Sequence, residues 1–347
     1  MHPDLQPLAD RFVRYLAERW GRPVVLRTIE QIPGGASRET YRVRVESAGE
    51  VQGLILRRDP VSSLIDTERA LEYQTYAAVH GSAVPVPEPI ILEEDTRHLD
   101  RPFSVMREIP GCETGIPPLG EAPYAAVRDT IGRNKWTLLG TLAAMDVEAL
   151  GVTRFMDVPE HPAARELDYW AGVVEADAQH PQPVAQAAVR WLRRNLPAPG
   201  PRLSLVHGDY RSGNFLYNDK GEIKGVLDWE MAHIGDPLED LAWSLDPLWS
   251  WPERRLAGGL LPREQAIALW EAASGMAVDR QAFRWWQIFA SIKGLAIWIS
   301  STEDFLHGET KEPILAMAGW VMTDRQNRIL VDRLQPESAH LYAEAVV

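Results

Sequence analysis

Short segments in which apolar and polar residues alternate fill much of the first hundred residues of the chain. The stretches VVLRTIEQIPG, TYRVRVES and GLILRRDP are separated by turn-forming residues, and this pattern predicts three strands. EPIILEED and RPFSVMREIPG predict two more. Helical spacing of apolar residues precedes these strands at the N-terminus and returns over residues 64–80, where VPVPEP ends it. We therefore expect an antiparallel sheet with a helix beside it.

From about residue 123 the apolar pattern is mostly helical. The composition changes at Pro110-Gly111, which we take as the hinge between two lobes, residues 1–109 and 110–347. A chain of 347 residues is longer than one ordinary core, so two lobes are expected. The helices of the second lobe are predicted over residues 124–149, 164–177, 184–195, 263–273, 280–302 and 312–334.

One strand-like island interrupts the helical half: SLVHGDYRSGNFLYNDKGEIKGVLDWE, residues 204–230. Its apolar runs flank NDKG, which predicts a hairpin with its turn at residues 218–221. Such a hairpin returns Asp228 close to Asn214. Two oxygen ligands, with no cysteine and no paired histidine, suit a hard ion such as Mg²⁺. Asp209 then lies near the metal without being required as its ligand.

These elements together predict an α+β fold class. A small strand-rich lobe with one helix is joined by a hinge to a larger helical lobe that carries a polar hairpin loop. This organisation favours a bilobal protein-kinase-like fold.

Composition narrows the choice of partner. The chain has 36 Lys and Arg against 49 Asp and Glu, a formal charge of −13, and no basic block, so a nucleic-acid partner is disfavoured and a small molecule is expected. Cys112 is the single cysteine, which excludes an internal disulfide and a cysteine-built zinc site. No apolar run approaches the ~20 residues of a membrane helix, and charges interrupt the N-terminal pattern. We expect a cytoplasmic protein without a membrane partner; the sequence leaves its oligomeric state open.

Three linked motifs carry a family resemblance. His207-Gly208-Asp209 is followed five residues later by Asn214, Asp228 lies in LDWE, and GDPLEDLA spans residues 235–242. In order and spacing these motifs resemble the aminoglycoside phosphotransferase and choline-kinase-like family, whose fold and catalytic loop are those of protein kinases. The stretches ELDYW and RWLRRNLP are similar to the branch of kinase-like domains associated with acyl-CoA dehydrogenases.

The resemblance implies roles for these residues. Asp209 would accept or orient the proton of the acceptor hydroxyl as it attacks the γ-phosphorus of ATP, while Asn214 and Asp228 would hold Mg²⁺. His207 is expected to brace the loop through a backbone hydrogen bond rather than to act as a base. Asp240 is expected to hold the same loop.

A kinase-like reading also predicts a nucleotide site in the first lobe. Gly35 and Ser37, in the turn PGGAS, would bring backbone N–H groups near the phosphates. The third strand carries Arg57 and Arg58 where the family usually has a lysine; Arg57 aligns best, and a period of two puts the pair on opposite faces. The glutamate on the helix that would fix this cation is expected to be Glu72, in preference to Glu68 one helical turn away. The hinge that would bind the adenine is expected to be the backbone of residues 106–109, with Arg107 and Ile109 as the contacts.

The acceptor is left open by the sequence. An aminoglycoside-like acceptor would need carboxylates, for which Glu303, Asp304 and Glu309 are candidates. A hydroxylated metabolite or hydroxyacyl compound would need a basic patch, for which Lys293 and Arg284 are candidates. The tryptophans after residue 240 are expected mainly to pack helices.

A second class of function is also kept open. The missing third-strand lysine and the reduced glycine turn would fit a pseudokinase, which binds a nucleotide or ligand without turnover. The joint presence of Asp209, Asn214 and Asp228 argues instead for an ATP- and Mg²⁺-dependent O-phosphotransferase. The choice between ATP and GTP stays open.

Overall fold

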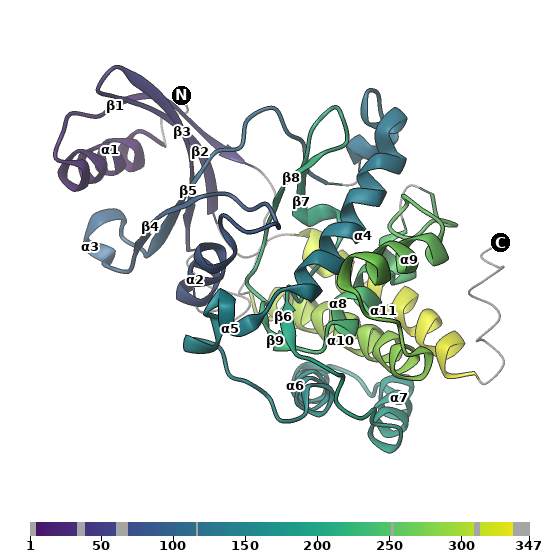
Figure 1. Ribbon diagram of the computed structural model, residues 1–347. Coiled ribbons are helices and arrows are strands. Elements are labelled where there is room, and N and C mark those ends of the chain that lie inside the picture. The colour runs from purple at the N-terminus through teal and green to yellow at the C-terminus, as the bar shows by residue number, and fades with distance from the viewer. Residues whose placement is uncertain are drawn as a thin grey trace.

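The computed structural model describes residues 5–32, 39–59, 69–115, 117–250, 253–308 and 313–335. Figure 1 shows a sheet with its helices beside a larger helical part. The sheet has five strands in the order β1-β2-β3-β5-β4, and every neighbouring pair is antiparallel. Its strands are β1 (Val25–Ile32), β2 (Glu39–Ser47), β3 (Glu50–Arg58), β4 (Pro89–Glu93) and β5 (Phe103–Arg107).

The two faces of this sheet pack against different cores. Residues Val43 and Val45 of β2 and Leu54 of β3 are buried in one core with the apolar face of α1 (Gln6–Trp20). Ile55, which alternates with Leu54 and Leu56 on β3, faces the other way and packs against the core of the helical part. The period of two in the sequence therefore turns one face of β3 toward each core.

Helix α2 (Arg69–Val79) lies between the sheet and the helical part, and Tyr76 and Val79 on it are buried in the core of the latter. Met106 of β5 belongs to the same core. Contacts across the predicted boundary at residues 109 and 110 are thus apolar and extensive. The short α3 (Thr96–Leu99) packs on α1 at the far side of the sheet.

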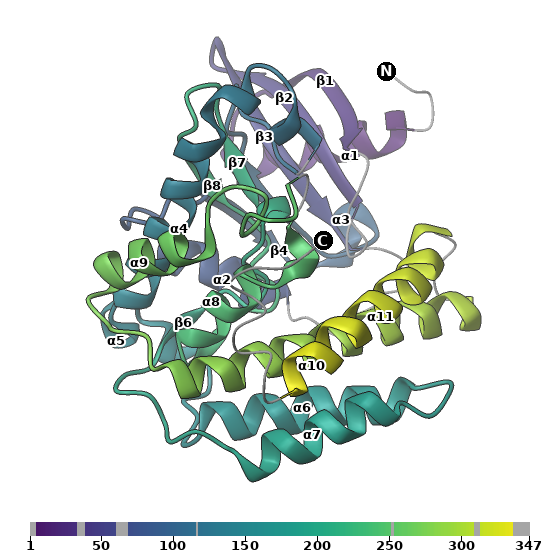
Figure 2. The same ribbon diagram turned by 90° about the vertical axis from the view of Figure 1, so that its right-hand side faces the viewer.

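Helices build most of the remaining chain. Helices α10 (Arg280–His307) and α11 (Pro313–Leu334) run side by side as a long hairpin, with α6 (Pro162–Asp177) and α7 (Pro183–Arg194) beneath them in Figure 2. Short 3₁₀ turns link the elements: η2 (Pro117–Gly120), η3 (Tyr124–Val127), η4 (Val152–Arg154), η5 (Ser212–Asn214) and η6 (Pro247–Trp249). The helices are α4 (Arg128–Ala144), α5 (Val147–Leu150), α6 (Pro162–Asp177), α7 (Pro183–Arg194), α8 (Leu238–Ser244), α9 (Arg263–Ser274), α10 (Arg280–His307) and α11 (Pro313–Leu334).

The helix predicted over residues 124–149 is wrong as a single element. The chain leaves the helix at Met145, and the Asp146 side chain accepts hydrogen bonds from the N–H groups of Glu148 and Ala149, so it begins a new short helix. Two other differences are that α10 continues to His307, beyond the predicted end at residue 302, and that α8 was not among the predicted helices. Among the described residues, no helix is long and apolar enough to cross a membrane.

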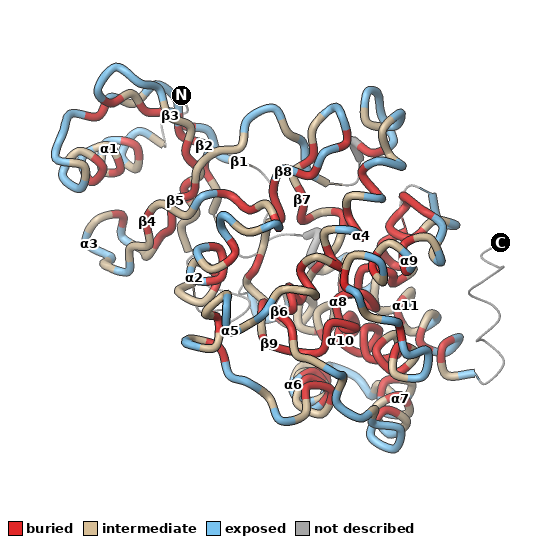
Figure 3. Tube along the Cα trace, in the orientation of Figure 1, coloured by how far each residue is buried: buried red, intermediate tan, exposed pale blue. Residues whose placement is uncertain are grey.

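Two small strand pairs lie between the sheet and the helices. β7 (Phe215–Tyr217) and β8 (Ile223–Val226) form the predicted hairpin, whose turn is held by Asn218 Oδ1 accepting from Lys220 and Glu222 N–H. β6 (Ser204–Val206) pairs with β9 (His233–Gly235). Figure 3 shows that the chain is largely buried through these strands and α8. The loop at residues 207–214, which connects β6 to β7, is therefore held on a rigid support.

Candidate active site

Loop 207–214 is fixed from below by one carboxylate. Asp240 of α8 accepts hydrogen bonds from the His207 N–H at 2.6 Å and the Gly208 N–H at 3.0 Å. Gly208 has a φ of 85°, and a Cβ atom there would collide with Met231, so only glycine fits. The buried carboxylate thus sets the direction in which the loop leaves β6.

The His207 side chain is fully used by the loop. Its Nδ1 accepts the Asp209 N–H at 3.1 Å, so its proton lies on Nε2, which donates to the Leu227 carbonyl at 2.8 Å. The ring is completely buried. This imidazole joins the loop to the strand end before Asp228 and has no free nitrogen for a substrate.

Three donors converge on the Asp209 carboxylate. Trp243 Nε1 donates to Oδ1 at 2.9 Å, Asn214 Nδ2 donates to Oδ2 at 2.8 Å, and Arg211 Nε lies 3.0 Å from Oδ2. The side chain remains 14% exposed. Asp209 is therefore held in one orientation while one side stays open to a reactant.

Asn214 and Asp228 meet at the base of the hairpin, where the Leu227 N–H donates to the Asn214 carbonyl at 2.8 Å. Both amide hydrogens of Asn214 are used, by the Asp209 carbonyl at 2.9 Å and its carboxylate, so the amide oxygen is the atom left to bind a cation. Asp228 has a φ of 68°, and its N–H donates to the Tyr76 hydroxyl at 2.9 Å. One amide oxygen and one carboxylate form a donor set that fits Mg²⁺.

Arg57 reaches the same place from β3. It forms an ion pair with Glu72 of α2, and its Nη2 lies 3.4 Å from Asp228 Oδ1. Arg58 points to the opposite face, where its Nε donates to Glu39 at 2.9 Å. Of the two arginines, Arg57 is therefore the one beside the candidate cation site.

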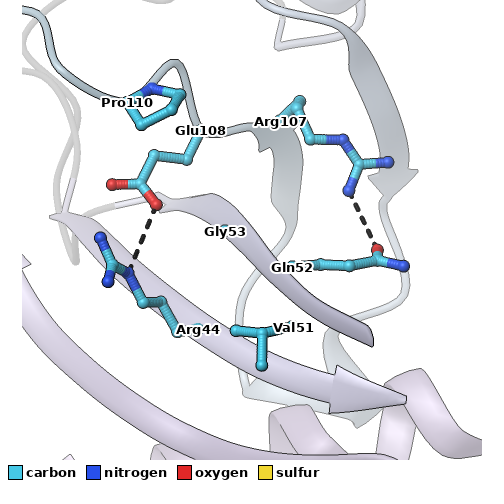
Figure 4. A pocket seen from close by; sticks show the side chains of 7 residues that line it. All are labelled: Arg44, Val51, Gln52, Gly53, Arg107, Glu108 and Pro110. Carbon is cyan, nitrogen blue, oxygen red and sulfur yellow. Dashed lines mark hydrogen bonds and ion pairs between the residues drawn. The ribbon is translucent and has the colours of Figure 1, made fainter. Parts of the chain in front are cut away.

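The hinge segment before Pro110 is anchored on its outer side. The Arg107 side chain donates to Gln52 at 2.9 Å and to Glu88 at 3.1 Å. Its N–H donates to the Glu88 carbonyl at 2.9 Å, so neither the side chain nor the N–H of Arg107 is available for the nucleotide contact expected from the sequence. Figure 4 shows Glu108 crossing Gly53 toward Arg44, in a surface hollow of about 350 Å³.

Ile109, the second expected adenine contact, packs toward Gly225 of β8. Among the described residues its N–H has no backbone hydrogen-bond partner. The remaining expected nucleotide contacts, Gly35 and Ser37, lie outside the described residues, as does Glu68.

A buried ionic cluster, missed by the sequence analysis, supports α8. Glu239 lies between Lys293 of α10 at 2.9 Å and His233 of β9 at 3.1 Å, and Glu166 of α6 lies 3.6 Å from His233. Burial lowers the pKa of His233, but the charges of Glu166 and Glu239 outweigh this and raise it to about 9. These carboxylates lie close enough to share a metal ion, yet the two cations already balance their charge. The cluster holds the helix that carries Asp240 and Trp243.

Two expectations for the acceptor side are therefore corrected. Lys293 is only 1% exposed and paired with Glu239, so it cannot form a basic patch for an acceptor. Glu303 is paired with His307 at 2.8 Å, and Asp304 is buried. Arg284 stacks on Trp191 at 5.7 Å, and Glu309 lies outside the described residues.

Two partners of Asp209, Arg211 and Trp243, were not predicted from the sequence. Arg211 stands two positions after Asp209 in the same motif, and this proximity was the available signal. Nothing in the spacing of the tryptophans distinguished Trp243 from the buried Trp270 and Trp285, which pack helices as predicted.

Known proteins are similar to this chain in sequence. The pattern of the phosphotransferase enzyme family matches residues 28–286. Acyl-CoA dehydrogenase family member 10 of Mus musculus is 29% identical over 224 residues, which are 62% of this chain and 20% of that protein. The chain thus spans about a fifth of the length of this curated relative.

Two solved structures share the fold. A Ralstonia eutropha protein provisionally assigned as an aminoglycoside phosphotransferase superposes with a TM-score of 0.75 at 20% identity, covering 94% of this chain and 97% of that one. A thermostable mutant of aminoglycoside phosphotransferase APH(4)-Ia, in a ternary complex with AMP-PNP and hygromycin B, gives a TM-score of 0.62 at 16% identity, with coverages of 92% of this chain and 97% of that one.

The predicted kinase-like fold is confirmed by these neighbours, and the resemblance carried by the loop motifs is confirmed by the family match over residues 28–286. The chain belongs to the phosphotransferase enzyme family.

Proposed function

We propose that this protein transfers the γ-phosphate of ATP to a hydroxyl group of a small molecule, in a reaction that depends on Mg²⁺. The observation that carries the proposal is the meeting of Asp209, Asn214 and Asp228 at one hairpin base, with the Arg57–Glu72 ion pair against it. The complex of APH(4)-Ia with AMP-PNP and hygromycin B supports a nucleotide and a small-molecule acceptor.

In this proposal the two parts of the chain divide the work. Residues 1–109 would bind the nucleotide and residues 110–347 would supply the reacting groups and the acceptor site. Arg57 would neutralise phosphate oxygens while Glu72 keeps its guanidinium in place. The backbone of Ile109 would contact the base, and Gly35 and Ser37 the phosphates.

Asp209 would act on the acceptor. Its carboxylate takes the proton of the attacking hydroxyl as the new oxygen–phosphorus bond forms and the bond from the γ-phosphorus to the bridging oxygen breaks, so the products are a phosphate ester and ADP. Trp243, Arg211 and Asn214 hold this carboxylate in one orientation. A Mg²⁺ ion held by Asn214 and Asp228 would neutralise charge on the phosphates.

The proposal is tested by incubating the purified full chain with Mg-ATP and a panel of alcohols: hygromycin B, sugars, hydroxy acids and their amides. Product formation is followed by mass spectrometry as the gain of one phosphoryl group, together with ADP release. We expect at least one acceptor to be phosphorylated in proportion to ADP. Tight Mg-ATP binding with no phosphorylated acceptor would instead identify a binding module without turnover.

A further inference from the structure

Arg211 is a cation beside Asp209 that the protein uses only in part. Its Nε donates to Asp209 Oδ1 at 3.1 Å and to Oδ2 at 3.0 Å. Within the described part of the chain, neither Nη1 nor Nη2 has a hydrogen-bond or ion-pair partner. The side chain is 30% exposed. Most of the donors of this guanidinium are therefore available to a ligand at the Asp209 carboxylate.

The orientation of the guanidinium is fixed by its neighbours. Its Cζ lies 5.2 Å from the centroid of the Trp249 ring, a cation–π distance. On another side Nη1 lies over Gly213, where a Cβ atom would collide with it. The donors are thus held in place before any ligand binds, which lowers the entropy cost of recognition.

The surroundings of Arg211 are aromatic. Trp249 lies 5.2 Å from Trp243, the residue that donates to Asp209, and 6.2 Å from Trp298 of α10. Besides Asp209, the carboxylates whose charges act on Arg211 are Asp228, which belongs to the candidate cation site, and Glu230. Two of the carboxylates that could have met an ammonium group are already committed: Glu303 to His307, and Asp304 to a buried position. The Arg211 side of Asp209 therefore offers a cation and apolar surface.

We propose that Arg211 binds a carboxylate of the acceptor, so that the enzyme selects hydroxy acids, with their carbon chain against the Trp249 ring, over polycationic acceptors. A guanidinium fork matches a carboxylate through two parallel hydrogen bonds, and this geometry also fixes the distance from the carboxylate to the hydroxyl at Asp209. The inference rests on the proposed phosphotransfer and leaves its chemistry unchanged.

The test compares pairs of acceptors that differ only in charge. Wild type, Arg211→Gln and Arg211→Lys are assayed with hydroxylated monocarboxylic acids of increasing chain length, with the primary amide of each acid, and with hygromycin B. The quantity measured is the ratio of kcat/KM for an acid to kcat/KM for its amide. Because both acceptors need the same phosphotransfer step, damage to Asp209 cancels from this ratio.

We expect wild type to prefer the best acid over its amide by about tenfold to a hundredfold, the value of a charged hydrogen-bonded contact. In Arg211→Gln this ratio should fall to about one, and Arg211→Lys should keep part of it. Arg193→Gln, which removes an exposed cation on α7, should keep the wild-type ratio. Thermal unfolding of each variant checks that it is folded.

Three results would overturn the inference. If Arg211→Gln lowers kcat/KM for the acid and kcat/KM for its amide by the same factor, Arg211 serves the transferred phosphate instead of the acceptor. If hygromycin B is a better acceptor than every acid, the charge preference is opposite to the one proposed. If no acceptor of any charge is phosphorylated, the proposed function itself fails, and that outcome is distinct from phosphorylation without charge preference.

Discussion

Arg57 Nη2 lies 3.4 Å from Asp228 Oδ1, so a cation from the N-terminal sheet meets a carboxylate from the hairpin of the helical part. Glu72 holds the same guanidinium from α2. Three elements far apart in sequence thus place opposite charges at one point, and a Mg-nucleotide would carry both kinds of charge to that point. We therefore propose that Arg57 takes the place of the lysine that the family usually carries on the third strand.

Arg57→Ala should weaken Mg-ATP binding by about tenfold to a hundredfold, because charged hydrogen bonds to phosphate are lost. Arg58→Ala is the matched control, since Arg58 lies on the opposite face and pairs with Glu39. Isothermal titration calorimetry of both variants measures the difference. A loss of affinity in Arg58→Ala alone would show that the assignment is reversed.

Asp240→Asn should reduce both stability and turnover. An amide in this position would face the His207 and Gly208 N–H groups with one donor of its own, so we expect a loss of about 1–3 kcal/mol in the free energy of unfolding. Because loop 207–214 would loosen, kcat should fall more than KM for ATP rises. Asp168→Asn, which breaks only an exposed ion pair with Arg193, should change neither by much. Equal behaviour of the two variants in urea unfolding and kinetics would contradict this role.

The sequence predicted those features of the site that depend on short spacing. Asn214 and Asp228 follow Asp209 within one hairpin, so the turn at residues 218–221 was enough to bring them together. The sequence also predicted that Arg57 and Arg58 point to opposite faces of the sheet, because successive side chains alternate along a strand. Both are local consequences of backbone geometry.

Contacts between distant segments could not be predicted in the same way. The segment SIKGLAIW does not reveal that Lys293 faces Glu239, since both lie on helices whose rotation is fixed only by packing. The hydrogen bond from Trp243 to Asp209 could not be predicted for the same reason, because the rotation of α8 is fixed by packing. The helix break at Asp146 was hidden because apolar spacing continues through it, and only the capping hydrogen bonds mark the new start.

Lys135 on α4 gives a prediction for pH dependence. It is completely buried, with Nζ 4.7 Å from the Trp136 ring centroid and 3.4 Å from Ser212 Oγ. No carboxylate among the described residues forms an ion pair with it. Burial, and then the charge of Arg211, lower its pKa to about 7.

The contribution of Lys135 to folding stability depends on pH because the folded and unfolded chains bind its proton with different pKa values. Between about pH 7 and the ordinary lysine pKa near 10.4, the unfolded chain binds a proton at Lys135 that the folded chain does not, so this group's contribution to stability rises with pH. Lys135→Met should therefore stabilise the protein, most strongly at about pH 6, with the gain smaller by about 3 kcal/mol at about pH 9. Urea unfolding at both values measures this. A gain that is the same at both pH values would mean that Lys135 does not change its charge.

The candidate cation site predicts a metal requirement with a residue-specific signature. Removal of divalent ions by EDTA should stop phosphotransfer, and Mg²⁺ should restore it. Asp228→Asn should raise the Mg²⁺ concentration for half-maximal activity by more than about tenfold, because one anionic ligand is lost. Asp219→Asn changes an exposed aspartate in the hairpin turn and should leave that concentration unchanged. A shift of similar size in both variants would exclude Asp228 as a ligand.

The central claim is that Asp209 acts on the acceptor hydroxyl and not on the nucleotide. The most direct test measures Mg-ATP affinity and the single-turnover rate of phosphoryl transfer in wild type, Asp209→Asn and Asp219→Asn. We predict that Asp209→Asn binds Mg-ATP within about threefold of wild type and transfers the phosphoryl group about a hundredfold to ten-thousandfold more slowly, whereas Asp219→Asn matches wild type in both. Transfer by Asp209→Asn at the wild-type rate, or a loss of rate fully explained by weaker nucleotide binding, would contradict the account.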